Sequence, residues 1–229
     1  MTGHIVAIGG GDFWEPPGDP RLDAFILALT GVERPRVCFL PTASGDSEWS
    51  VAAFYRAMAR HDCRPTDLTL FPRTVADIPA LLAEQDVIWV WGGSTLNLLA
   101  LWRLHGIDGA LRDAYERGAV LCGMSAGMNC WFESCTTDSF GLELAPLHDG
   151  LGFLAGSACP HYDGEAQRRP LYRRLVDAGE LAPGWAADND VALHFAGGDF
   201  AEAVTLRDGA AAYRVEPGSE VRVAARLLE

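Results

Sequence analysis

The feature that most constrains this 229-residue chain is a short apolar run that stops at a Gly-x-Ser-x-Gly motif. Residues 119–122 form the run, and Gly123-Met124-Ser125-Ala126-Gly127 follows at once. This pattern is typical of a nucleophile elbow, in which a buried strand turns sharply into a helix and presents a serine hydroxyl beyond the sheet. The glycines relieve the crowding of such a turn. The alternative is a tight strand-to-helix turn in which the serine is incidental.

Apolar runs and amphipathic segments alternate over roughly the first 130 residues. The runs predict strands at residues 5–8, 36–40, 68–71, 86–91 and 119–122, and the amphipathic segments predict helices at 21–30, 48–61, 78–85, 96–104 and 107–117. This alternation predicts an α/β fold: a three-layer sandwich with a mostly parallel central sheet and helices on both faces. A further strand at 151–158, a helix at 165–177 and short strands over 192–225 are expected to extend or flank that sheet. We interpret residues 1–229 as a single domain.

Three of the predicted strands end in loops that are unusual for simple connections, at residues 9–12, 92–95 and 123–127. Open parallel sheets bind their ligands at the carboxyl ends of the strands. The loop Gly9-Gly10-Gly11-Asp12 lacks the third glycine of a dinucleotide fingerprint, and the chain has no Gly-Lys-Ser/Thr phosphate loop. These loops therefore predict a catalytic site without a nucleotide.

Charge and cysteine usage exclude several classes of partner. A formal net charge of −13 argues against binding to nucleic acid or to an anionic membrane. The six cysteines have no C-x-x-C pair and no metal-ligand spacing, which indicates reduced thiols in a cytoplasmic protein. We see neither a signal peptide nor an apolar run of membrane-spanning length. We expect a monomer or a homodimer without a metal or an organic cofactor.

A serine nucleophile needs donors that stabilise the oxyanion and a base that accepts its proton. The backbone N–H of Ala126 directly follows the serine, and Gly93 in a neighbouring strand-end loop offers a second N–H group. The alternative role of Gly93 is a plain helix-initiating turn. Of the six histidines, we favour His161 as the base, because Pro160 restricts the backbone just before it.

The base in turn needs an acceptor that fixes its tautomer. The sequence alone does not choose among the acids that surround the candidate serine and histidine, which are Glu133, Asp138, Asp163, Asp188 and Asp190.

In combination, these motifs resemble those of the peptidase E / cyanophycinase family. The resemblance implies a flavodoxin-like fold that is similar to the fold of class I glutamine amidotransferases. The resemblance spans nearly the whole chain and is greatest to the shorter, peptidase-E-like members. The segments that carry it are Gly9-Gly10-Gly11, Trp91-Gly92-Gly93-Ser94-Thr95, Gly123–Gly127 with Asn129, Thr137-Asp138 and Pro160-His161-Tyr162.

The resemblance implies a serine peptidase in which Ser125 is the nucleophile, His161 the general base, and Gly93 and Ala126 the oxyanion hole. By motif the acid is Asp138, with Asp188 or Asp190 as the alternative. The implied substrate is a small peptide, and peptidase E itself cleaves dipeptides that begin with aspartate. An acidic substrate side chain needs a cation, for which Arg168 and Arg169 are candidates; their alternative is a solvated helix face.

Two other functions remain open from the sequence. One is an amidase, an esterase or another amidotransferase-like hydrolase on the same scaffold. The other is a non-catalytic binding protein that has kept the scaffold and lost the activity, since the presence of the groups does not prove their geometry.

Overall fold

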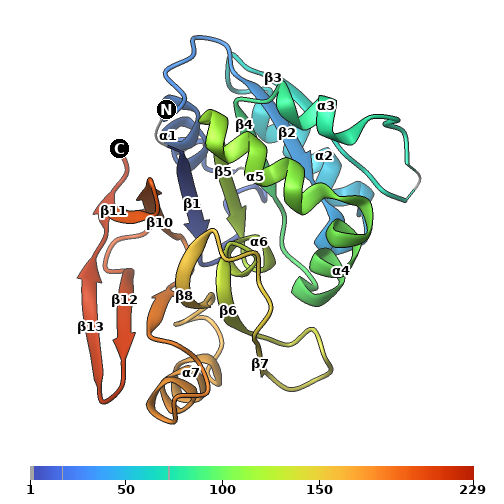
Figure 1. The fold of residues 1–229 in the computed structure, drawn as a ribbon. Coiled ribbons are helices and arrows are strands. Elements are labelled where there is room, and N and C mark those ends of the chain that lie inside the picture. The colour runs from blue at the N-terminus through green and yellow to red at the C-terminus, as the bar shows by residue number, and fades with distance from the viewer. Residues whose placement is uncertain (1–2, 17, 72) are drawn as a thin grey trace.

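The computed structural model of the protein describes residues 3–16, 18–71 and 73–229 (Figure 1). Within these residues, the larger sheet is built from β1 (His4–Ile8), β2 (Arg36–Leu40), β3 (Arg64–Asp67), β4 (Val87–Val90), β5 (Val120–Met124), β10 (Val191–Ala196), β11 (Asp199–Thr205) and β14 (Arg226–Leu227). Its strand order is β14-β11-β10-β1-β5-β4-β2-β3. The five strands from β1 to β3 in this order are parallel to one another, whereas β10 joins β1 in the antiparallel sense.

Helices cover both faces of the larger sheet, because alternate residues of its strands point to opposite sides. Ile5 and Ala7 face the layer that contains α3 (Ile78–Ala83), α4 (Thr95–His105) and α5 (Ile107–Arg117). Val6 and Ile8 face the layer that contains α1 (Arg21–Ala28) and α2 (Glu48–Met58). The predicted three-layer α/β sandwich with a mostly parallel sheet is confirmed.

The third strand was predicted at residues 68–71, but β3 lies at Arg64–Asp67. The apolar residues Leu68 and Leu70 instead fill the core from the loop that follows β3, and both are buried. An edge strand needs little apolar surface and tolerates proline, and Pro65 pairs with Val37 there.

Segments between residues 132 and 224 add a smaller sheet that the sequence predicted only as an extension or a flank. It contains β6 (Phe132–Thr137), β7 (Ala145–Leu147), β8 (Leu154–Cys159), β9 (Gly184–Ala187), β12 (Ala211–Glu216) and β13 (Ser219–Ala224), in the order β13-β12-β9-β8-β6-β7. One face packs on α7 (Arg168–Asp177), which lies beside the smaller sheet in Figure 1. Side chains of the other face join the core that also contains residues of α3–α5. The single domain over residues 1–229 stays a prediction.

Candidate active site

The elbow lies between β5 and α6 (Ala126–Asn129), and Ser125 adopts a φ of 57° and a ψ of −107°. A non-glycine residue in this conformation is strained, and such strain is characteristic of functional turns. Both glycines of the motif are required by close backbone contacts. A Cβ on Gly123 would lie 2.6 Å from the carbonyl oxygen of Gly127, and one on Gly127 would lie 2.4 Å from that of Val90. The helix after the serine, α6, has only four residues.

Two successive carbonyl groups at the end of β1 hold Ser125 and His161. The backbone N–H of Ser125 donates to Ile8 O at 3.0 Å, and that of His161 donates to Gly9 O at 2.8 Å. His161 also has a positive φ, of 53°. Among the described residues, no hydrogen bond joins Ser125 Oγ to the imidazole, as is common in substrate-free sites. The structure therefore brings the predicted nucleophile and base to the same strand end.

The ring of His161 is oriented by a residue that the sequence analysis missed. Its Nδ1 lies 2.8 Å from Oδ1 of Asn189, so an Nδ1–H tautomer donates to the amide oxygen and leaves Nε2 free. Gly10 makes room for this contact, because a Cβ there would lie 2.3 Å from Nδ1 and 2.4 Å from Oδ1. The search for a partner considered only carboxylates, although Asn189 stands between two of the candidates.

The predicted acids have other partners. Asp188 is buried, and its Oδ2 accepts from the N–H of Ala211 at 3.0 Å, while burial raises its pKa. Asp190 forms an ion pair with Arg207 at 3.2 Å. Asp138 is exposed just after β6 and acts on His161 only through its charge, which raises the pKa of the imidazole. None of the three is the residue that binds Nδ1 of His161 in the described structure.

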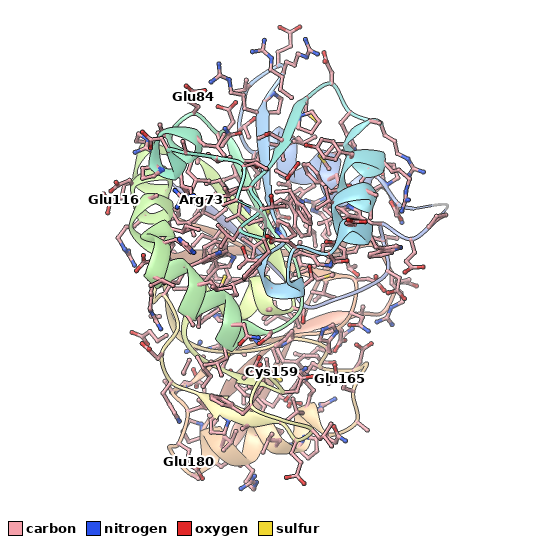
Figure 2. The ribbon with its side chains drawn as sticks, turned by 90° about the vertical axis from the view of Figure 1, so that its right-hand side faces the viewer. Arg73, Glu84, Glu116, Cys159, Glu165 and Glu180 are labelled. Carbon is pink, nitrogen blue, oxygen red and sulfur yellow. The ribbon has the colours of Figure 1, made fainter. Side chains whose placement is uncertain are left out.

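The environment of His161 favours the neutral imidazole that a general base requires. Burial lowers its pKa most, the hydrogen bond with Asn189 opposes this effect, and the positive charge of Arg168 lowers the pKa further. Arg168 is itself buried at 3% exposure. Its Nε donates to Oε2 of Glu165 at 2.9 Å, and its Nη1 donates to the carbonyl of Thr136 at 3.3 Å. Glu165 is labelled in Figure 2.

Arg169, the other predicted cation, is engaged elsewhere. It is exposed, forms an ion pair with Glu220, and lies over the rings of Tyr162 and Tyr213 at 5.5 and 5.0 Å. Of the two arginines, only Arg168 is among the charges that act on His161.

The two expected oxyanion donors flank the serine. A Cβ on Gly92 would lie 3.3 Å from Cβ of Ser125, so the Gly92–Gly93 turn borders the nucleophile. Gly93 is exposed, has a φ of 134°, and could carry no Cβ, because that atom would lie 2.2 Å from the carbonyl oxygen of Ala43. Among the backbone hydrogen bonds of the described turns and loops, none uses the N–H of Gly93 or of Ala126.

A strained serine at a strand end, beside a half-buried imidazole and two unused backbone donors, is typical of a serine hydrolase. The sequence profile of Peptidase family S51 matches residues 5–203. The chain therefore belongs to this family of serine peptidases, which confirms the predicted class of enzyme.

Several relatives support the assignment. The chain is 49% identical to the uncharacterized peptidase YgaJ of Bacillus subtilis strain 168, over 93% of this chain and 91% of that protein. It is 29% identical to peptidase E of Citrobacter koseri, over 62% of this chain and 66% of that protein.

Solved structures show the same fold. A peptidase from an acI-B1 actinobacterium superposes with a TM-score of 0.75 at 20% identity, covering 98% of this chain and 95% of the other. A putative peptidase E from Listeria monocytogenes EGD-e gives a TM-score of 0.67 at 18% identity, covering 90% of this chain and 100% of the other. No helix in the described part of the chain has the length and apolar character needed to cross a membrane.

Proposed function

We propose that this peptidase hydrolyses small peptides with Ser125 as nucleophile and His161 as general base. The observation that carries the proposal is the attachment of both residues to the successive carbonyl groups of Ile8 and Gly9. The six cysteines are free and buried, which supports the cytoplasm as the place of action.

In the proposed reaction, Nε2 of His161 takes the proton of Ser125 Oγ as the oxygen attacks the scissile carbonyl carbon. The N–H groups of Gly93 and Ala126 bind the oxyanion that forms. His161 then gives the proton to the leaving amine, so that the peptide bond breaks and an acyl-enzyme remains. Water, deprotonated by His161, attacks the ester carbonyl, and the acid product leaves with Ser125 restored.

Asn189 takes the third place of the proposed triad. Its amide oxygen fixes the Nδ1–H tautomer, as a carboxylate would, but it carries no charge to stabilise the imidazolium. The triad that we propose is therefore Ser125-His161-Asn189. Asn189 thereby replaces the acids Asp138, Asp188 and Asp190 as the candidate for the third residue of the triad.

Dipeptides with an N-terminal aspartate are the substrates to test first. The resemblance to peptidase E favours them, and the buried guanidinium of Arg168 acts on His161 from nearby. Glu165 and Thr136 accept from three of its N–H groups and fix its plane. In this proposal, its remaining two N–H groups bind the carboxylate of the substrate.

The test combines active-site labelling with a panel of dipeptides. We expect a fluorophosphonate to label the wild type and Ser219→Ala, which alters an exposed serine, but not Ser125→Ala. Labelling of Ser125→Ala would reject Ser125 as nucleophile. We expect Arg168→Lys to raise the KM of Asp-Xaa peptides about tenfold or more, because lysine lacks the planar guanidinium that binds a carboxylate with two hydrogen bonds. The KM of peptides with a neutral first residue should stay unchanged. An equal effect on both kinds of peptide would reject Arg168 as the carboxylate-binding group.

A further inference from the structure

One guanidinium, that of Arg207, ties together the loops that carry His161 and Asn189. Arg207 follows β11, and its Nη2 donates to Oδ2 of Asp163 at 2.5 Å and to the carbonyl of Asn189 at 3.1 Å. Its Nε donates to Oδ2 of Asp190 at 3.2 Å. Asp163 belongs to the loop after His161, whereas Asn189 and Asp190 belong to the turn between β9 and β10. The arginine thus joins two segments that are distant in the sequence.

Both backbone polar groups of Asn189 are held by this cluster. Its carbonyl accepts from Arg207, and its N–H donates to Oδ1 of Asp163 at 2.8 Å. Asp163 therefore binds Asn189 with one oxygen and Arg207 with the other. These two bonds fix the backbone of Asn189 at the place from which its side chain reaches His161.

The surrounding loops pack too closely to absorb a displacement of Asn189. A Cβ on Gly164 would lie 2.5 Å from Nδ2 of Asn189, and a Cβ on Gly11 would lie 2.2 Å from Oδ1 of Asp190. The N–H of Asp190 donates to the carbonyl of Gly10 at 2.8 Å. A shift of the turn between β9 and β10 would therefore displace the side chain of Asn189 and lengthen its hydrogen bond with His161.

The charges favour a positioning role over a contribution to stability. The Arg207 side chain is 46% exposed, and ion pairs as exposed as this one add little to the free energy of unfolding. Its charge nevertheless balances the two carboxylates of Asp163 and Asp190, which would otherwise repel each other and loosen the turn. Arg207 also lies beyond residue 203, where the family match ends.

We propose that Arg207 is a positioning residue of the peptidase: it clamps the two loops so that Asn189 stays hydrogen-bonded to His161. This inference rests on the proposed role of His161 as general base. It assigns a function in the reaction to an exposed side chain that contacts neither the serine nor the histidine directly.

A double-mutant cycle between Arg207 and Asn189 tests the inference. We expect Arg207→Gln to lower kcat about tenfold with little change in KM, because a misplaced base slows the chemical step. In the Asn189→Ala background the same change should cost less than about twofold, since the group through which it acts is gone. Arg207→Lys, which keeps the charge but not the three-bond fork, should recover part of kcat. Arg226→Gln, which breaks another exposed ion pair with Glu202, should leave kcat unchanged. An equal loss in both backgrounds would overturn the clamp.

Hydrogen exchange of the Asn189 backbone amide provides a readout that needs no substrate. Arg207→Gln should speed this exchange about tenfold relative to the wild type and Arg226→Gln, because the partner Asp163 loses its counter-ion. Unchanged exchange would overturn the clamp even in an active enzyme. The converse result is that the fluorophosphonate labels Ser125 in no variant while Arg207→Gln still speeds the exchange of the Asn189 amide. That result would reject the proposed function and retain the clamp.

Discussion

Replacing Asn189 with aspartate is the sharpest test of how the protein sets the pKa of the proposed base, His161. The substitution keeps an oxygen 2.8 Å from Nδ1 of His161 and adds a negative charge to it. A carboxylate beside an imidazole favours the imidazolium, so the pKa of His161 should rise. The acid limb of kcat/KM, where the base becomes protonated, should therefore move to higher pH.

The size of the shift follows from the contact distance. At 2.8 Å, and with an effective dielectric constant of about 20, the charge pair is worth about 6 kcal/mol before the carboxylate is desolvated. Burial of the new carboxylate and repulsion from Asp163 and Asp190 oppose this gain. We therefore expect a net rise of about 1–2 pKa units, equivalent to about 1.4–3 kcal/mol.

Two measurements give the pKa independently. The pH dependence of kcat/KM reports the free enzyme, and an NMR titration of the His161 ring in the Ser125→Ala background requires no turnover. Asn97→Asp adds the same charge at an exposed residue of α4 that has no hydrogen bond to His161 or Asn189 among the described residues, and it should leave both values unchanged. Asn189→Ala should instead lower the pKa, because the hydrogen bond that raises it is lost.

The reasoning would be refuted by an acid limb that stays in place in Asn189→Asp, or that moves equally in Asn97→Asp. The first result would mean that Asn189 does not contact the titrating ring. The second would mean that the shift reflects net charge alone.

Two further predictions concern the glycine loop and the buried carboxyl of Asp23. Gly10→Ala should reduce fluorophosphonate labelling about a hundredfold, because its Cβ would lie 2.3 Å from His161 Nδ1, whereas Gly31→Ala, at a φ of 64° with open space around it, should label normally. Equal labelling of the two variants would contradict the steric argument. Burial raises the pKa of Asp23 to about 7, so the folded protein holds a proton that the unfolded chain releases near pH 4, and stability should fall as pH rises from about 4 to 7. An asparagine at this position can still accept the hydrogen bond from Trp14. In urea unfolding, Asp23→Asn should therefore be more stable than the wild type by up to about 4 kcal/mol at pH 8, and by much less at pH 5. The same difference at both pH values would show that Asp23 does not titrate in this range.

Apart from the edge strand β3, the parallel half of the fold could be predicted from local patterns, and so could the positions of Ser125 and His161 in their loops. Buried parallel strands are short apolar runs, three of which lead into glycine loops here, and this signal needs no knowledge of distant partners. The smaller sheet pairs strands that other elements separate in the sequence, such as β9 and β12, through short segments of mixed polarity. Its order therefore depends on tertiary packing that no local window contains.

The partner of His161 could not be predicted for a different reason. An asparagine in a turn has an obvious local use, and nothing in Asp188-Asn189-Asp190 says which of the three side chains faces the imidazole. That choice is made by Ala211, which binds Asp188, and by Arg207, which binds Asp190. Both partners come from later segments of the chain.

The attachment of Ser125 and His161 to Ile8 and Gly9 has a consequence for how the enzyme can vary. The spacing of the two reactive residues is measured along one strand, by a single peptide unit of about 3.3 Å, and not through the segment that separates them. The β6–β7 turn can therefore lengthen, shorten or be remodelled for new substrates without resetting that distance.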